Sequence, residues 1–255
     1  QQGLYFDTIA GTSAGGIIGC AYASGMHLPD ILRLLNREMT PSRWFRMMPR
    51  GNRASLFCDF RYGRIETKLR KYLFDYDLKQ LLLPISTVAV DLVSGRQIVS
   101  DSGDVVQAIR ASANHPVFGA PIMRDDMALV DGGILNNVPA TVLRQQGADY
   151  ILSIDVGAKL NPTFGKPGKS IADEIERRAS YMGTLMRVLE IIQRGHSTAS
   201  IEQSDYVITP DTSAFPFEDF TKAEDLTKAG RVAATDALPE FLDEVKPWLT
   251  KAPAH

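Results

Sequence analysis

A serine between two glycines is the feature of this sequence that most directly indicates chemistry. Gly11-Thr12-Ser13-Ala14-Gly15 fits the pattern G-x-S-x-G, after a strand-like run at residues 5–9 and before residues with helical apolar spacing. A sharp turn from strand to helix crowds the backbone, which favours glycine on either side of the serine. Such a turn raises the Ser13 hydroxyl above the sheet edge, where the Ala14 N–H would face a developing oxyanion. We therefore interpret Ser13 as a nucleophile, with a phosphate-binding turn or a tight packing turn as the alternatives.

A catalytic serine needs a general base, and the sequence offers two candidates. Asp131 ends a strand-like run, and Gly132 and Gly133 after it let the backbone bring the carboxylate close to a neighbour. A partly desolvated carboxylate can act as base, while the alternative is an ordinary Asp-Gly turn; spacing alone leaves both open. His196 would complete the order serine, acid, histidine. However, Arg194-Gly195-His196 is typical of a helix break, with no strand to deliver the imidazole to the sheet edge.

Neither a metal nor an organic cofactor is expected. The two cysteines, Cys20 and Cys58, have no C-x-x-C spacing, which excludes a disulfide scaffold and a zinc site built from cysteines. No Cys/His cluster or carboxylate pair indicates a metal. His115 is expected to be structural.

The elements that must position these residues alternate between strands and helices. Strand-like runs occur at residues 5–9, 84–90, 97–100, 128–130, 150–155 and 205–209. Helical spacing occurs at residues 17–22, 28–39, 65–73, 104–112, 139–146, 171–194 and 221–244. The alternation predicts one α/β domain, with a hairpin at Ser94-Gly95 and the run at 150–155 inside a parallel sheet. Residues 41–60 are predicted to be irregular, and residues 161–169 to form a loop.

The composition is that of an ordinary globular protein. The chain has 255 residues, of which 44% are apolar and 23% charged, which excludes wholesale disorder and a collagen-like fibre. No run of about 18 apolar residues occurs, so no bilayer-spanning helix is expected. Residues 33–71 carry a charge of +8 and residues 202–244 a charge of −8, although the net charge is −2. This asymmetry indicates a face for an anionic partner, or else two regions that face each other or lie on ordinary solvated helices.

Four blocks in this sequence together resemble the patatin-like phospholipases, in their bacterial and neuropathy-target-esterase-like branch. They are the glycine–serine motif continued by Gly16, an Ala-Ser-Ala…Pro…Phe block at residues 111–118, the Asp-Gly-Gly…Asn…Pro run at residues 131–139, and the strand ending in Asp155-Val156-Gly157. The resemblance covers nearly the whole chain, residues 1–255, as a single domain. It implies a three-layer α/β/α fold with a mainly parallel central sheet.

The resemblance also implies an activity and roles for particular residues. It makes Ser13 the nucleophile and Asp131 the base of a Ser-Asp dyad without histidine, with Gly11, Ala14 and Gly15 in the nucleophile elbow and Gly132 and Gly133 in the loop that supports the dyad. The implied function is a serine lipid acyl hydrolase (phospholipase A, lysophospholipase or carboxylesterase) that forms an acyl-enzyme. A lipid transacylase and a catalytically silent lipid-binding module remain alternatives.

The family's glycine-rich oxyanion loop, of the Gly-Gly-x-Arg-Gly type, does not occur in this sequence. The chain begins at Gln1 without a methionine or a signal sequence, and we expect the missing strand and loop upstream of residue 1. Loss of one oxyanion donor typically lowers turnover by about 10²–10³, so this chain alone is expected to have impaired activity.

A basic and aromatic segment is a candidate for contact with the substrate's surroundings. Residues 44–53 interleave basic with bulky apolar side chains, the candidates being Trp44, Phe45, Arg46, Met47 and Arg50. This pattern suits docking on an anionic lipid surface or a lid over an acyl channel; a packing loop with solvated arginines is the alternative. We expect a phospholipid or other acyl-ester substrate, no nucleic acid, and a cytoplasmic or membrane-peripheral location. The oligomeric state is left open.

Overall fold

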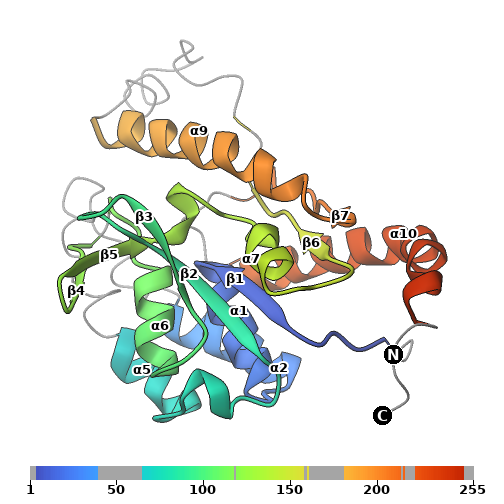
Figure 1. Cartoon of the computed structure of the whole chain (residues 1–255), viewed down its shortest axis with the longest axis horizontal. Coiled ribbons are helices and arrows are strands. Elements are labelled where there is room, and N and C mark those ends of the chain that lie inside the picture. Colours follow the sequence, from blue (N-terminus) through green and yellow to red (C-terminus); the bar gives the residue numbers. More distant parts are fainter. Residues whose placement is uncertain are drawn as a thin grey trace.

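A mixed five-stranded sheet forms the centre of the fold (Figure 1). The computed structural model describes residues 4–39, 65–117, 119–157, 160, 181–213, 215 and 222–249. The strands of this sheet are β1 (Ile9–Thr12), β2 (Ile85–Asp91), β3 (Arg96–Ser100), β4 (Ile122–Arg124) and β5 (Met127–Asp131). Their order is β1-β2-β5-β4, with β3 also paired to β2.

Strand β2 is the centre of this sheet, and both of its edges are used. Strand β3 pairs with residues 87–91 of β2, β1 with residues 85–88 and β5 with residues 89–91. At any one position, a strand can pair with only one neighbour on each of its two edges. Strands β1 and β5, which both overlap β3 along β2, therefore share the edge opposite β3, and their pairings meet between Val88 and Ala89.

One face of the sheet is covered by apolar helices. They are α1 (Ala14–Ala23), α2 (Leu28–Leu34), the π-helical η1 (Leu35–Met39), α5 (Ile65–Leu73) and α6 (Val105–Ser112), with the short η2 (Leu78–Gln80) beside them. Ile65, Leu69 and Leu73 recur every four residues and are all buried, so α5 faces the core with one stripe. Ile17 and Ile109 join the same core cluster.

The opposite face carries α7 (Ala140–Gln145) and α9 (Tyr181–Ile201), which gives three layers (Figure 1). Ile85 belongs to the core on the α1 side. Its neighbour Ser86 therefore points to the other face, where Gln146 at the end of α7 donates a 2.8 Å hydrogen bond to it. The Ser200 hydroxyl on α9 donates to the carbonyl of Val138, just before α7.

A second, two-stranded parallel sheet consists of β6 (Leu152–Ile154) and β7 (Tyr206–Ile208). Helix α10 (Ala223–Leu249) packs on β7, with the ring of Phe241 against Tyr206 and Tyr150. The run at residues 150–155 was predicted to lie inside a larger parallel sheet. It is parallel to its partner, but among the described residues it pairs only with β7.

The α/β class is confirmed, but a mainly parallel sheet is not. Only β1–β2 is parallel among the four pairings of the larger sheet. Short connections account for two of the three antiparallel pairings, β2–β3 and β4–β5, because strands joined by tight turns can only be antiparallel. Gly95 at φ +68° turns β2 into β3, and Asp125 at φ +53° turns β4 into β5. Strand β4, of only three residues, was not predicted at all.

Within the described residues the predicted helices occur at their expected positions, but two of them extend further: α10 ends at Leu249 rather than near residue 244, and α9 passes residue 194. Helix α9 continues through Gly195 to Ile201, so the expected break before His196 is wrong. A Cβ at Gly195 would meet nothing within 4 Å, so close packing does not require glycine at this position. The irregular segment at 41–60, the loop at 161–169 and the first part of the predicted helix at 171–194 lie outside the described residues.

Candidate active site

Ser13 occupies a sharp turn between β1 and α1. Its backbone has φ 54° and ψ −118°, in the left-handed half of the map that residues with side chains rarely adopt. The turn also presses Gly11 against the helix: a Cβ there would lie 2.5 Å from the Gly15 carbonyl oxygen. Gly15 has open space instead, so close packing requires glycine at position 11 but not at position 15. The start of α1 turns outward at Gly15 and leaves it exposed.

The strained turn is held by a residue from another helix. The Ser13 N–H donates a 3.0 Å hydrogen bond to Oγ of Ser112, the last residue of α6, whose side chain is fully buried. Sequence reasoning gave Ser112 no role. The only signal was its place in the Ala-Ser-Ala block, and a serine among small residues looks like ordinary helix packing.

Asp131 is brought to Ser13 by the arrangement of the strands. Thr12 ends β1 opposite Val88, and Asp131 ends β5 opposite Ala89, the next residue of β2. Since β1 and β5 share one edge of β2 and run in opposite directions, their C-terminal ends meet there. The sequence predicted that Ser13 and Asp131 lie at strand ends, but it did not predict that the two strands run toward each other.

The Ser13 and Asp131 side chains interact in a nearly dry setting. Asp131 is only 2% exposed, its carboxylate accepts a 2.8 Å hydrogen bond from the Gly133 N–H, and the Ser13 side chain is near enough to lower its pKa by hydrogen bonding. Burial penalises the charged carboxylate and raises the pKa of Asp131 to about 6, although the two hydrogen bonds act in the opposite direction. A carboxylate with such a pKa is ionised at neutral pH and still basic enough to accept a proton.

The loop after Asp131 fits closely against β2. It forms the 3₁₀ turn η3 (Gly132–Ile134), in which a Cβ on Gly132 would lie 2.3 Å from the carbonyl oxygen of Val88. A Cβ on Gly133 would lie 3.0 Å from the Asn137 side-chain oxygen. Glycine is therefore required at position 132 by close packing rather than by an unusual φ.

A polar network ties this loop to the elements around it. The Thr12 hydroxyl donates a 2.7 Å hydrogen bond to the Asn136 carbonyl, which joins the end of β1 to the loop. The buried Asn136 amide donates to Gln97 on β3 and to Thr141 on α7, both at 2.9 Å. The sequence showed Asn136 only as part of the Asp-Gly-Gly…Asn…Pro run, and gave no sign of Gln97.

The N-terminus of α1 is the candidate oxyanion site. The first N–H groups of any helix lack acceptors within the helix, and here they begin at Ala14, beside Ser13. Ala14 is exposed, so a substrate carbonyl can reach this end of the helix. The helix dipole favours negative charge at this position.

Neither His196 nor His115 is among the groups that shift the pKa of Asp131. His196 is exposed on α9, and the hydrogen bonds that affect the Asp131 carboxylate come from Ser13 and Gly133. His115 is buried. Trp44, Phe45, Arg46, Met47 and Arg50 lie outside the described residues. Within the described ranges, no three His, Cys, Asp or Glu side chains gather in a cluster that could hold a metal ion.

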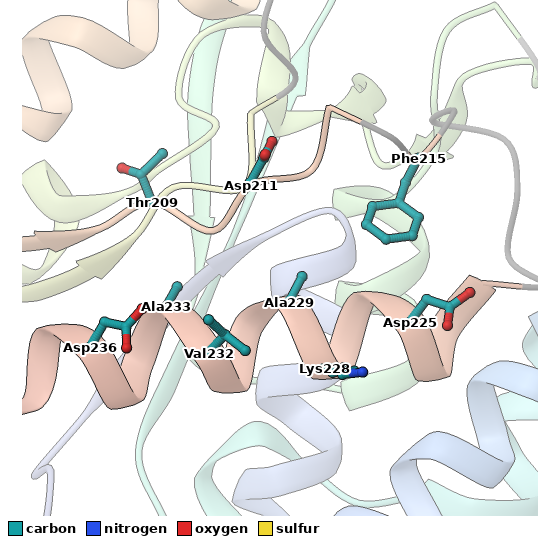
Figure 2. Close-up of a pocket in the computed structure, with 9 residues that line it drawn as sticks. All are labelled: Thr209, Asp211, Phe215, Asp225, Lys228, Ala229, Val232, Ala233 and Asp236. Atoms are coloured by element: carbon teal, nitrogen blue, oxygen red, sulfur yellow. The ribbon is translucent and has the colours of Figure 1, made fainter.

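An open hollow of about 690 Å³ lies elsewhere, between α10 and the chain that follows β7 (Figure 2). Its lining residues are Thr209, Asp211, Phe215, Asp225, Lys228, Ala229, Val232, Ala233 and Asp236. Neither Ser13 nor Asp131 contributes to it, and its acidic rim does not suit an anionic head group.

Some charges of the two asymmetric regions form ion pairs in the part of the chain that the structure describes. Arg70 on α5 pairs with Glu66, Asp75 and Asp104, at 2.7–3.2 Å. Asp205, in the acidic C-terminal region, pairs with Arg144 at 2.7 Å. Among the described residues, no ion pair joins the basic region at 33–71 to the acidic region at 202–244.

The part of the chain that the structure describes contains no helix that is both long and apolar enough to cross a bilayer.

Curated proteins with similar sequences carry the same kind of domain. An uncharacterized NTE family protein of Mycobacterium tuberculosis is 25% identical over 259 residues, which cover 96% of this chain and 44% of that protein. Patatin-like phospholipase domain-containing protein 6 of Homo sapiens is 25% identical over 256 residues, covering 90% of this chain and 18% of that protein. This chain therefore spans less than half the length of these relatives.

Among the solved structures that match is the crystal structure of VipD from Legionella pneumophila, with a TM-score of 0.41 and 14% identity over 89% of this chain and 61% of that chain. The profile of the patatin-like phospholipases matches residues 1–144, more than half of the chain and the part that holds both Ser13 and Asp131. The motif blocks and the sequence matches agree, and this chain belongs to the patatin-like phospholipase family.

Proposed function

We propose that this chain is the catalytic domain of a serine lipid acyl hydrolase in which Ser13 and Asp131 form the catalytic dyad. One observation carries the proposal: β1 and β5 end against consecutive residues of β2, which puts Ser13 beside the buried Asp131, whose pKa burial raises to about 6 although hydrogen bonding with Ser13 lowers it. Membership of the patatin-like phospholipase family supports a lipid ester as substrate. The proposed activities are those of a phospholipase A, a lysophospholipase or a carboxylesterase.

The first half of the reaction is acyl transfer to the serine. Asp131 accepts the hydroxyl proton as Ser13 Oγ attacks the carbonyl carbon of the ester. The negative charge on the former carbonyl oxygen is stabilised by the Ala14 N–H at the start of α1. When the tetrahedral intermediate collapses, the carbon–oxygen bond to the alcohol breaks and Asp131 returns the proton to that oxygen. The lysolipid or alcohol leaves, and the acyl group stays on Ser13.

The second half is hydrolysis of the acyl-enzyme. Asp131, ionised again, accepts a proton from a water molecule as that water attacks the acyl carbon. Collapse of the second intermediate breaks the bond to Ser13 Oγ, which regains its proton from Asp131. The fatty acid leaves and the dyad is restored.

The test is fatty acid release from phosphatidylcholine and lysophosphatidylcholine by the full-length gene product. We expect release from at least one of them, and its loss in the Ser13→Ala variant. Added glycerol or lysolipid distinguishes the alternatives: acyl transfer to the added alcohol in preference to water would identify a transacylase. Binding of lipid without any acyl chemistry would contradict the proposal and leave a lipid-binding module.

A further inference from the structure

Helix α9 exposes its apolar side chains instead of burying them. Leu185, Val188, Ile191 and Ile192 are 36%, 45%, 51% and 37% exposed. At 100° per residue these four positions fall within an arc of about 120° on the helix surface. We call this arc the outer stripe of α9.

The outer stripe also lacks charge. The other exposed residues of the same arc are Thr184, Gly195 and Ala199, and the exposed Arg194 and His196 lie beyond its two borders. Arg187 forms a 3.1 Å ion pair with Glu190, and its side chain is only 15% exposed, so it adds little charge to this surface. A helix that faces water normally carries its charges on the outer face.

The inward face of α9 holds polar residues against the Asp131 loop. Gln193 packs on this loop, since a Cβ built on Gly133 would lie 3.3 Å from its side-chain nitrogen. Ser197 and Ser200 are buried, and the Ser200 hydroxyl bonds the Val138 carbonyl. Thr141 donates its N–H to Ser200 Oγ at 3.3 Å and accepts from the Asn136 amide. The outer stripe is thus carried by a helix tied directly to the loop that holds Asp131.

We propose that the outer stripe of α9 docks on a lipid surface of zwitterionic head groups and holds the Ser13–Asp131 pair beside it. The inference rests on the proposed function, because acyl chains of a phospholipid substrate lie in a membrane. Aliphatic side chains without neighbouring charge favour insertion among acyl chains over attraction to anionic head groups. In this proposal α9 lies along the interface, with its outer stripe toward the lipid and its polar inward face against the Asp131 loop.

The test is co-sedimentation of the full-length protein with vesicles of ether-linked phosphatidylcholine, which the enzyme cannot hydrolyse. We expect Val188→Ser combined with Ile191→Ser to lower vesicle affinity by about tenfold or more. The matched control is Leu82→Ser with Met123→Ser, two apolar residues outside α9 that are 80% and 69% exposed. The control is expected to bind as the wild type does. Because the stripe is uncharged, binding should persist from ~0.05 M to ~0.5 M salt.

A short-chain ester dissolved as monomers separates this inference from the proposed function. We expect the α9 double variant to hydrolyse this ester at the wild-type rate while it loses activity on vesicles. Absence of soluble-ester hydrolysis in the wild type would instead count against the proposed dyad, and vesicle binding would still test the stripe. Unchanged vesicle affinity of the α9 variant, or binding abolished by salt, would overturn the inference. The inference would also be overturned if the wild type were a dimer that does not bind vesicles and if the α9 variant were a monomer, because a second copy of the chain would then cover the stripe.

Discussion

Thr12 and Asp131 end two strands that run toward each other along one edge of β2, against its consecutive residues Val88 and Ala89. This arrangement places the residue after Thr12, Ser13, beside the Asp131 carboxylate without any long loop. It also explains the glycine after Asp131, because the chain must leave β5 across the carbonyl of Val88. The pairing of β1 and β5 with β2 therefore sets the position of Ser13 relative to Asp131.

The pKa of Asp131 predicts how reactivity depends on pH. Asp131 must be ionised to accept the Ser13 proton, and burial raises its pKa to about 6. Reaction of Ser13 with an ester or phosphonate probe should therefore reach a plateau above pH ~6 and fall about tenfold per pH unit below it. The rate of probe incorporation between pH ~4 and pH ~8 measures this. A midpoint near the ordinary value of 3.8 would contradict the rise in the pKa of Asp131 that burial causes.

Asp131→Asn should remove activity and yet stabilise the fold at neutral pH. The folded pKa of about 6 lies above the ordinary 3.8, so the folded protein binds the proton more tightly, and ionisation of Asp131 lowers stability as pH rises from 3.8 to about 6. The neutral asparagine avoids this loss and can keep hydrogen bonds to Ser13 and Gly133. Urea unfolding at pH ~7 should show a gain on the order of 3 kcal/mol at most, which vanishes below pH ~4. A less stable variant at neutral pH would contradict the assigned burial cost.

Ser112→Ala should slow the reaction of Ser13 although Ser112 touches no substrate. The change removes the acceptor of the Ser13 N–H and leaves this group unpaired in a strained turn, at a cost of about 1–3 kcal/mol. We expect probe incorporation at Ser13 to fall about tenfold. Ser86→Ala is the matched control, because it also deletes a buried hydroxyl that bonds a side chain, that of Gln146. Equal probe rates in both variants would show that Ser112 only adds stability.

Gly132→Ala should be far more damaging than an alanine elsewhere. Its Cβ would lie 2.3 Å from the Val88 carbonyl oxygen, which is backbone of the central strand and has no room to move away. The loss of stability should be on the order of 3 kcal/mol or more, accompanied by loss of probe incorporation. Gly230→Ala in α10 meets nothing within 4 Å and should instead stabilise by roughly 0.5–1 kcal/mol. Thermal unfolding of the two variants compares them directly.

The local elements could be predicted from the sequence because their signals are local. The apolar spacing of Ile65, Leu69 and Leu73 defined α5, and Gly95 fixed the hairpin of β2 and β3. The direction of β5 was not predictable, since a strand of five residues reads the same whether its partner is parallel or antiparallel. The extent of α9 was misjudged at Gly195, where packing along the helix outweighs the low helix propensity of one glycine.

The candidate site was also predictable in part, because local sequence motifs mark its two central residues. Ser13 and Asp131 stand in recognisable motifs, and the structure brings them together. The residues that hold them could not be found in this way. Ser112 lies 99 positions from Ser13, and Gln97 lies 39 positions from Asn136. Contacts over such distances follow from how helices and strands pack, which the sequence pattern around each residue does not encode.

The most direct test of the proposed dyad is labelling of the full-length gene product with a fluorophosphonate probe, in the wild type and in Ser13→Ala, Asp131→Asn and His196→Ala. The dyad predicts no label on Ser13→Ala, labelling slowed by about 10²-fold or more in Asp131→Asn, and the wild-type rate in His196→Ala. Full labelling of Asp131→Asn, or loss of labelling in His196→Ala, would contradict it.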